Sequence, residues 1–355
     1  MTLDELTKSC TIRDSDELSP SLGCLLGRKL TLERAKMSTV NEVNWGIVGT
    51  SGWAYSKFAP SVVSGGGKLV GAAGSSPDGS RRMAKSFGSD VFQSVEELLD
   101  DPRIEAVWIA SPTNLHLQHA AMALERNKHV LLEKPIASNQ ADAQAILELA
   151  NAHPNQITGI GFQHRFNPAH IRLREMCQNG ELGAVAFLRF HFFVGSESAP
   201  MSWRSDPQRS GGWASNDLGT HLLDLVRFII GEVELACGLL TSPRYNLAVD
   251  DTAVFLLRSG PTPAVVDVST GVAGAESRLE VYGTQGYAIV TNSWPGGGII
   301  HTRDGMESWE PIDTYAKQVE AFGEAVRGAR WEGAGWNDGM IVTSLISEAK
   351  LEATK

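Results

Sequence analysis

A short apolar run in the sequence ends abruptly in two opposite charges. Val130 to Leu132 are strand-forming residues, and Glu133, Lys134 and Pro135 follow them directly. An amine or a carboxylate can exchange a proton with a substrate when burial or a neighbouring charge shifts its pKa towards neutrality. The alternative is a strand that reaches the surface and ends in hydrated charges, so the position of this segment in the fold must decide.

A second polar pattern lies on a predicted helix over 216–230. Asp217, His221 and Asp224 stand at i, i+4 and i+7 among mostly apolar residues, and that spacing puts all three on one face. A histidine on an apolar helix is more often a hydrogen-bonded core residue than a catalytic one. Here Gly219 permits close backbone approach and the preceding loop carries tryptophan and arginine, which favours a site.

The first half of the chain alternates short apolar runs with stretches of helical period. The predicted strands are 43–49, 68–75, 91–93, 106–111, 129–134 and 157–163, and the helices between them are 53–63, 79–87, 94–101, 115–127 and 139–152. This alternation predicts a doubly wound parallel sheet of the Rossmann type.

The pattern changes after residue 164. A helix over 167–179 leads to a long strand over 184–195 and then to the helix over 216–230. Four strand-like runs follow at 234–241, 252–259, 263–271 and 278–291, and two closing helices are predicted at 314–328 and 338–353. Strands that are not separated by helices predict an α+β domain with an open, predominantly antiparallel sheet. We expect the two closing helices to return to the first domain. The fold class is therefore α/β.

Length and composition are consistent with this division. A chain of 355 residues suits two domains, which we place at 43–163 for dinucleotide binding and 164–355 for substrate and oligomerisation. Residues 1–42 read as an extension, because the first 36 contain no aromatic residue and only one short apolar patch. We expect Met37 to be the natural start.

Several classes of partner and location are excluded by charge and hydropathy. The net charge of −10 offers no basic excess for nucleic acid, and no apolar run approaches the roughly 20 residues of a membrane span. The N-terminus has no secretory apolar region. Cys10, Cys24, Cys177 and Cys237 lack metal-binding spacing, so we expect free thiols, a cytoplasmic protein and no metal site.

A glycine-containing turn follows the first predicted strand. In "GIVGTSGWA" the motif is Gly49-x-Ser51-x-x-Ala54, where small residues allow the backbone to approach a pyrophosphate at the helix N-terminus. Serine replaces the usual middle glycine. The alternative is a tight strand–helix turn, but the position at the first strand favours nucleotide binding. The predicted cofactor contacts here are Gly49, Thr50, Ser51, Gly52, Trp53 and Ala54.

The end of the second predicted strand bears on the choice of nucleotide. An acid there would hold the ribose hydroxyl of NAD, but the chain has Ser75 and Ser76, followed by Arg81. Hydroxyls and a guanidinium suit a 2′-phosphate, so NADP(H) is favoured and NAD(H) remains possible. The alternative is that Arg81 and the adjacent Arg82 are both solvated helix residues.

Three strand ends should meet at one edge of the first sheet. In the strand order 3-2-1-4-5-6, ligands bind where the order reverses between the first and fourth strands. The fourth strand ends in Ser111, Pro112, Thr113, Asn114 and His116, and the fifth in Glu133 and Lys134. We therefore expect these residues beside the nicotinamide, which weakens the surface-strand alternative.

Several motifs together resemble one known family. "EKP", "SPTNLHLQHA", "GFQHRFNPA", "SGGWASNDLGTHLLDLVRFIIG", "VDDTAVFLL" and "LEVYGTQG" occur in order and resemble the Gfo/Idh/MocA (glucose–fructose oxidoreductase / inositol dehydrogenase) family over residues 43 to 355. The resemblance implies a Rossmann domain, an open-faced substrate domain, and sugar or cyclitol redox chemistry with NAD(P).

The resemblance also implies an acid–base group made of Lys134, Asp217 and His221. We expect Lys134 to hydrogen-bond the reacting oxygen, His221 to transfer or share its proton, and Asp217 to orient the hydroxyl or the histidine. The family also suggests a cis bond at Pro135. Trp213 and Asn216 depart from the family pattern, so its substrate preferences are not carried over.

Three other residues complete the predicted site. We expect Arg165 to face the nicotinamide or the substrate, with a surface ion pair as the alternative, and Trp203 and Arg204 to shape the sugar pocket. Substrate-selecting contacts are expected on loops 197–216 and 292–312.

The predicted function is an NAD(P)-dependent oxidoreductase acting on a secondary alcohol or carbonyl of a sugar, polyol or related carbohydrate. The alternative is a non-catalytic nucleotide sensor or regulator of the same fold. An amino-acid biosynthetic dehydrogenase has no support in the motifs. The open sheet face predicts a homodimer or homotetramer.

Overall fold

The computed structural model describes residues 42–200, 202–294 and 296–353. The predicted extension over 1–42 therefore lies outside the described residues except for Glu42. Residues 41–355 form one compact unit, and everything below concerns that unit.

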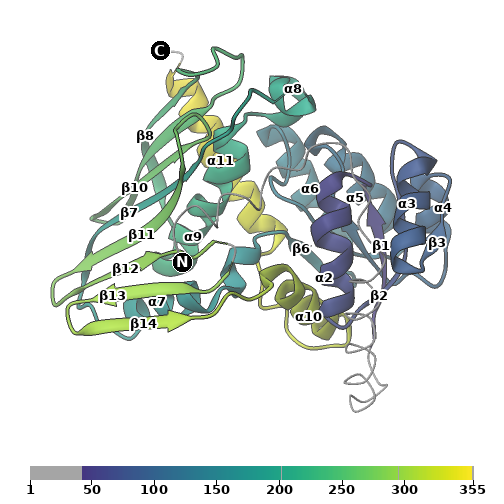
Figure 1. Cartoon of the computed structure of the whole chain (residues 1–355), viewed down its shortest axis with the longest axis horizontal. Helices are drawn as coiled ribbons and strands as arrows, with labels where there is room; N and C mark the ends of the chain where they lie inside the picture. The colour runs from purple at the N-terminus through teal and green to yellow at the C-terminus, as the bar shows by residue number, and fades with distance from the viewer. Residues whose placement is uncertain (1–41, 201, 295, 354–355) are drawn as a thin grey trace. The chain divides into compact units, whose positions relative to one another are not determined.

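The first sheet has six parallel strands in the order β3-β2-β1-β4-β5-β6 (Figure 1). They are β1 (Asn44–Val48), β2 (Lys68–Ala73), β3 (Asp90–Val91), β4 (Ala106–Ile109), β5 (His129–Leu132) and β6 (Thr158–Ile160). The core of this sheet is fully buried, as with Trp45 and Trp108 at its centre, because helices cover both faces. The predicted doubly wound sheet is confirmed.

Helices separate the strands of this half, and three of them begin at a short polar side chain that caps them. They are the π-helical η4 (Ala54–Phe58), α2 (Ala59–Ser64), α3 (Pro77–Phe87), α4 (Val95–Asp100), α5 (His116–Glu125) and α6 (Gln140–Ala152). Ser76, Ser94 and Asn139 each accept a hydrogen bond from a backbone N–H in the first turn of α3, α4 and α6. Helix α3 starts two residues earlier than predicted because Ser76 caps it and Pro77 occupies its first turn.

The second sheet has eight strands in the order β14-β13-β12-β11-β7-β10-β9-β8. They are β7 (Val185–Val194), β8 (Glu234–Thr241), β9 (Thr252–Ser259), β10 (Thr262–Ser269), β11 (Ala275–Gly283), β12 (Tyr287–Thr291), β13 (Gly298–Thr302) and β14 (Gly305–Trp309). Only β7 and β10 pair in parallel among these neighbours, so the predicted, mostly antiparallel sheet is confirmed.

Two details of this sheet correct the sequence-based prediction. The run 278–291 is a hairpin, β11 and β12, and not one strand. The segment 292–312, expected to be a loop, contains the paired strands β13 and β14. Each is five residues long and begins at a glycine, Gly298 or Gly305, with positive φ, and such short glycine-flanked strands read as loop.

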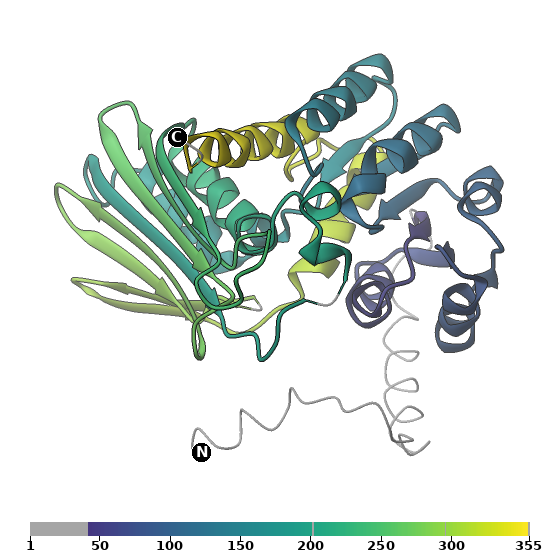
Figure 2. The same ribbon diagram turned by 90° about the horizontal axis from the view of Figure 1, so that it is seen from above.

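Helices α7 (Pro168–Gln178), α9 (Thr220–Ile230) and α11 (Trp336–Ala353) lie on one side of the second sheet (Figures 1 and 2). Helix α11 contacts β8 where Gly238 meets Ala349, and it reaches the first sheet through a hydrogen bond from Trp336 Nε1 to the Gly159 carbonyl. Helix α10 (Thr314–Val326) packs Phe322 against Trp45. Helix α11 therefore contacts both sheets, and helix α10 contacts the first sheet.

Considering the described residues alone, the opposite face of the second sheet exposes several apolar side chains. Leu239 on β8 and Val254 and Leu256 on β9 are adjacent in register and are 56%, 37% and 42% exposed. Among the described residues, no helix is both long enough and apolar enough to span a bilayer.

Candidate active site

The glycine turn after β1 is held tightly between β2 and β4. Gly49 has φ +123°, and an added Cβ would lie 2.5 Å from the Ala110 carbonyl oxygen. Its N–H donates to the Ala73 carbonyl at 2.7 Å. Only glycine suits this conformation and this approach, so the turn lies where the strand order reverses, as predicted.

Ser51 has a specific role in place of the usual middle glycine. Its Oγ accepts a hydrogen bond from the Ala54 N–H at 3.2 Å, which satisfies one N–H at the helix start. The next residue, Gly52, has open space around it, and Trp53 is 47% exposed. The serine side chain therefore caps the first helical turn, and the space beside Gly52 stays open.

The predicted 2′-phosphate residues lie at the end of β2 and the start of α3. Ser75 and Ser76 are exposed, and Arg81 pairs with Asp78. The neighbouring Arg82, absent from the predicted contacts, donates from Nη2 to the Thr50 carbonyl at 3.1 Å. This second guanidinium therefore lies closer to the glycine turn.

The loop after β4 is joined to the loop after β5 by His116. The ring is 1% exposed; Nδ1 lies 3.0 Å from the Pro135 carbonyl oxygen and Nε2 lies 3.0 Å from that of Ser111. Burial lowers the pKa of His116 to about 4. Because both ring nitrogens face backbone carbonyls, these contacts favour a positioning role for His116 over the predicted contact with a cofactor.

The other predicted residues of the β4 loop differ in accessibility. Thr113 is buried in the short helix η5 (Thr113–Leu115), whereas Asn114 is exposed and Ser111 and Pro112 are intermediate. Ser111 Oγ lies 2.9 Å from His119 Nδ1. The exposed edge of this loop is therefore formed mainly by Asn114.

Glu133 points into the sheet edge and not into solvent. Trp108 Nε1 donates to its Oε1 at 3.0 Å, and an added Cβ on Gly161 would lie 2.7 Å from the same oxygen. Burial raises the pKa of Glu133 to about 7, which the charge on Lys134 partly opposes. This carboxyl can therefore change its charge near neutral pH.

Lys134 reaches the second half of the unit. Its Nζ donates to the Asp217 carbonyl at 2.8 Å and lies 3.8 Å from Asp217 Oδ1. The bond to Pro135 is cis. Burial lowers the pKa of Lys134, and the charge of Asp217 only partly opposes this. The structure thus brings the predicted lysine and aspartate together, and burial makes the amine easier to deprotonate than an exposed lysine.

Asp217 stands in an irregular stretch of the predicted helix. Residues Ser215–Gly219 form the π-helix η8 immediately before α9, a conformation often found at functional sites. The start of this stretch is fixed by Asp250, whose carboxylate accepts from Ser215 N at 2.6 Å. Asp217 Oδ2 accepts from Arg204 Nε at 3.1 Å.

Trp203 and Arg204 come together as predicted for a pocket wall. The Arg204 guanidinium lies 4.6 Å from the centre of the Trp203 ring. Because Arg204 also contacts Asp217, it connects this wall to the lysine–aspartate pair.

His221 lies one helical turn beyond Asp217 and is 3% exposed. Burial lowers its pKa well below 6.5, and the charge of Lys134 lowers it further, so the imidazole is neutral and electrostatically coupled to the lysine. The His164 ring stands edge-on to it with 4.7 Å between ring centres, and Trp294 lies beyond. Neither His164 nor Trp294 was predicted. The two closely spaced histidines of "QHRFNPAH" could have indicated His164.

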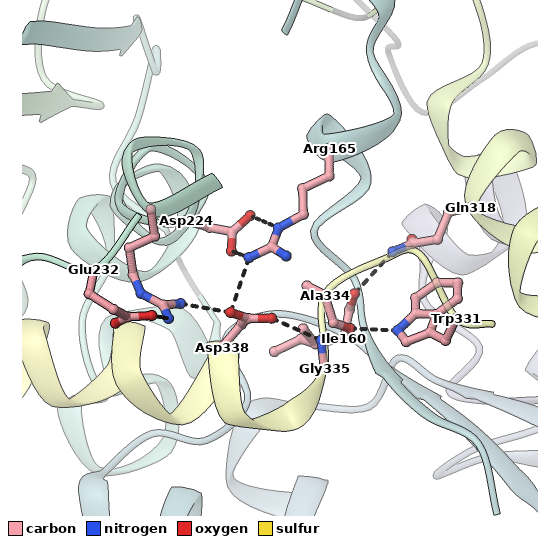
Figure 3. A network of polar contacts seen from close by, with 10 residues as sticks. Ile160, Arg165, Asp224, Glu232, Gln318, Trp331, Ala334, Gly335 and Asp338 are labelled. Atoms are coloured by element: carbon pink, nitrogen blue, oxygen red, sulfur yellow. Dashed lines mark hydrogen bonds and ion pairs between the residues drawn. The ribbon is translucent and has the colours of Figure 1, made fainter. Parts of the chain in front are cut away.

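Arg165 belongs to a buried ion network (Figure 3). Its Nε and Nη2 donate to the two carboxylate oxygens of Asp224 at 2.9 and 2.6 Å, and Nη2 lies 3.2 Å from Asp338 Oδ1. Arg227 Nη1 donates to the same Asp338 oxygen at 2.8 Å and Nη2 donates to Glu232 at 2.7 Å. We call Arg165, Asp224, Arg227 and Asp338 the ion network.

The ion network changes the interpretation of Arg165. Burial alone would lower its pKa, but the two carboxylates raise the pKa above its ordinary value. Asp224, expected on the same helix face as Asp217 and His221, directs its carboxylate to Arg165 instead. The contacts therefore favour the ion-pair alternative for Arg165, although the pair is buried and not on the surface.

The arrangement can perform proton transfer beside a bound dinucleotide. The residues at the ends of β1, β4 and β5 form the expected nucleotide edge, and Lys134, Asp217 and His221 converge beside it. Among the residues that the structure describes, no group of three His, Cys, Asp or Glu side chains could hold a metal ion.

Comparison with known proteins gives two adjoining family matches. Residues 43–161 match the GFO_IDH_MocA model, described as an oxidoreductase family with an NAD-binding Rossmann fold, and residues 170–289 match the GFO/IDH/MocA C-terminal domain.

The chain is also similar to individual proteins. It is 30% identical to the uncharacterized oxidoreductase YrbE of Bacillus subtilis (strain 168), over 70% of this chain and 76% of that protein. It is 27% identical to 1,5-anhydro-D-fructose reductase of Ensifer adhaerens, over 83% and 92%. The structure of levoglucosan dehydrogenase in complex with NADH and levoglucosan shares the fold, with a TM-score of 0.78 and 20% identity, over 88% of this chain and 97% of that chain.

Proposed function

We propose, from the premise that this chain belongs to the Gfo/Idh/MocA oxidoreductase family, that it moves a hydride between a nicotinamide cofactor and a secondary alcohol or carbonyl of a carbohydrate. The observation that carries the proposal is the position of Lys134. Its amine is buried at the nucleotide edge, 2.8 Å from the Asp217 carbonyl oxygen, with a lowered pKa.

Each residue has a role that its contacts support. When a sugar hydroxyl is oxidised, neutral Lys134 takes the hydroxyl proton, and in reduction the lysine ammonium returns a proton to the new hydroxyl. Neutral His221 shares this proton, and Asp217 orients the hydroxyl. A bound nicotinamide supplies or accepts the hydride. The residues proposed to hold it are the glycine turn and the β4 loop with Asn114 outermost; Glu133, also predicted to contact the cofactor, instead accepts a hydrogen bond from Trp108.

The proposed cofactor is NADP(H). Two exposed serines follow β2 where an acid would favour NAD, and Arg81 and Arg82 both lie in the second turn of α3. Because the guanidinium of Arg82 is already directed to the Thr50 carbonyl, we add it to the proposed 2′-phosphate contacts. The expected result is that Arg82→Ala weakens NADPH binding about tenfold more than NADH binding, since one charge-assisted hydrogen bond is lost.

The proposed substrate is a sugar or polyol, bound between the nucleotide edge and the wall formed by Trp203 and Arg204. The relative from Ensifer adhaerens is named as a reductase of 1,5-anhydro-D-fructose, which supports this class. We further propose that 43–163 binds the nucleotide and 164–355 provides the substrate wall and an interface between copies.

The proposed interface is the face of the second sheet opposite the helices. Burying the adjacent side chains of Leu239, Val254 and Leu256 in a dimer or tetramer would remove exposed apolar area from water. A monomer in light scattering at micromolar concentration would contradict this. We also propose a cytoplasmic location, since Cys177 and Cys237 are free thiols; Cys10 and Cys24 lie outside the described residues.

One experiment tests the central proposal. NADPH and NADH are bound by fluorescence titration, and sugars and polyols are then screened in both directions by the absorbance of the reduced nicotinamide. Turnover that Lys134→Met abolishes supports the proposal. Tight cofactor binding with no turnover across a broad panel contradicts it and indicates a nucleotide sensor.

A further inference from the structure

A small cavity lined by His221 lies between α7, α9 and the second sheet. It has a volume of about 20 Å³ and is lined by His164, His170, His191, His221 and Trp294, among others. A cavity needs roughly 10–15 Å³ to hold one water molecule, and that water needs two to four polar partners. The cavity therefore has room for an ordered water molecule.

Three of these histidines have an enclosed nitrogen that no protein group satisfies. Nδ1 of His164, Nε2 of His170 and Nδ1 of His221 are buried without a hydrogen-bond partner. The three residues are 5%, 2% and 3% exposed. Their rings are adjacent, with 4.7 Å between the centres of His164 and His221 and 5.7 Å between those of His164 and His170. A buried polar group without a hydrogen-bond partner is destabilising, so a partner such as a water is favoured here.

The tautomer of His170 follows from its other contact. Its Nδ1 lies 3.0 Å from the His164 carbonyl oxygen, and a carbonyl only accepts, so Nδ1 carries the hydrogen. Burial lowers the pKa of His170 to about 4, and the neutral ring therefore presents a lone pair at Nε2. A metal ion is a poor alternative occupant, because no three ligand groups in the described part of the chain lie at metal-binding distances from one another.

We propose that this cavity holds one ordered water molecule that donates a hydrogen bond to Nε2 of His170 and connects Nδ1 of His164 with Nδ1 of His221. The second O–H of the water then points to one of the two Nδ1 atoms, and the other Nδ1–H donates to the water. His164 and His221 consequently have opposite tautomers, and His170 is the residue that orients the water.

This inference rests on the proposed role of His221. When Nδ1 of His221 carries the hydrogen, its Nε2 has the lone pair that can take a proton from Lys134. When the water donates to Nδ1, Nε2 carries the hydrogen and can give it. The water and His170 thus link each of these forms of His221 to the opposite tautomer of His164, and His170 is a positioning residue that does not contact the substrate.

The test compares two substitutions at His170 in the full chain. In His170→Asn the shorter amide still donates to the His164 carbonyl but has no atom at the position of Nε2. In His170→Gln the longer amide places an oxygen there. We expect kcat to fall about tenfold or more in the Asn variant, since a misplaced histidine tautomer costs orders of magnitude, with KM unchanged and a changed solvent isotope effect. The Gln variant should retain most of kcat.

Two structural measurements do not depend on turnover. A high-resolution crystal structure should show a water within hydrogen-bond distance of the three nitrogens, and nitrogen NMR of labelled histidines should show opposite tautomers at His164 and His221, a relation that is lost in His170→Asn. His153→Asn is the matched control, because His153 Nδ1 also faces a backbone carbonyl, that of Leu149 at 2.9 Å, at the C-terminal end of α6.

The outcomes separate this inference from the proposed function. If His221→Phe keeps normal turnover, the catalytic role of His221 is wrong. If His221→Phe abolishes turnover while His170→Asn matches wild type in kcat and isotope effect, only the present inference is overturned. An empty cavity at high resolution also overturns it.

Discussion

The unit contains two buried clusters of charged residues that contact the same helix and differ in how completely they are paired. In the ion network, Arg165 forms a bidentate pair with Asp224, and Asp338 bridges Arg165 and Arg227. In the lysine site, Lys134 hydrogen-bonds a carbonyl and stands 3.8 Å from the nearest carboxylate oxygen of Asp217. Each charge of the first cluster lies within 3.2 Å of an opposite charge, whereas the Lys134 amine is 3.8 Å from the Asp217 carboxylate.

The pKa values follow this difference. Because arginine does not deprotonate in proteins, Asp224 stays ionised beside it even though burial pulls its pKa upward. The carboxylates likewise hold Arg165 in its charged form. At the lysine site burial dominates, lowering the pKa of Lys134 and raising that of Glu133. Similar residue types therefore form close ion pairs in one cluster, and in the other they form the site to which we assign proton transfer.

The largest expected effect is on the lysine site. Lys134→Met should lower kcat by about 10³-fold on a confirmed substrate, since a positioned acid–base group contributes about 10²–10⁴, while the free energy of unfolding changes little. Lys128→Met is the matched control, because Lys128 is also buried and donates to the Asp101 and Ile104 carbonyls away from the site. Near-normal turnover of the Lys134 variant would remove the distinction between the clusters.

In the ion network, a substitution should lower stability and leave catalysis unchanged. Asp224→Ala leaves Arg165 buried beside only one carboxylate, which typically costs about 3–5 kcal/mol, so the urea midpoint should fall while kcat per folded molecule is retained. The double variant Arg165→Met/Asp224→Leu should recover much of that stability. A large loss of kcat with unchanged stability would place Arg165 in the active site after all.

A third prediction concerns the pH dependence of Glu133. Its pKa rises from 4.5 in the unfolded chain to about 7 in the folded state, so the folded state binds the proton more tightly. Its contribution to stability is fully present below pH 4.5 and is lost as the pH rises towards 7, by at most about 3 kcal/mol. Unfolding at several pH values should show this slope in wild type and not in Glu133→Gln. Parallel curves for the two proteins would show that Glu133 is ionised throughout.

The smallest expected effect is at the exposed edge of the lysine site. Arg204 is 43% exposed at its side chain where it contacts Asp217, and such pairs contribute less than about 1 kcal/mol. Arg204→Met should therefore leave the unfolding midpoint nearly unchanged and raise KM for the sugar more than it lowers kcat. A loss of stability comparable to that of Asp224→Ala would show that the two clusters are equivalent.

Local features of the sequence predicted the frame of the site. The alternation of strands and helices indicated the first sheet, and with it the strand order that brings the glycine turn, the β4 loop and Lys134 to one edge. Short-range interactions determine the helix caps at Ser76 and Ser94 and the turn at Gly49. A cap needs one hydrogen bond within a single turn and the glycine turn needs one backbone angle, so neighbouring residues in the sequence are enough to predict both.

Other features depended on partners that are distant in sequence. The ion pairs of Arg165 require carboxylates from α9 and α11. The π-helical turn at Asp217 occurs together with a hydrogen bond from the Ser215 N–H to the Asp250 carboxylate. The enclosed nitrogens of His164, His170 and His221 come from three helices that pack around one cavity. The sequence by itself determined which groups stand at the strand ends, because a parallel sheet imposes their order. Only the tertiary structure decided which of the buried charges are fully paired, since that depends on side chains brought together by packing.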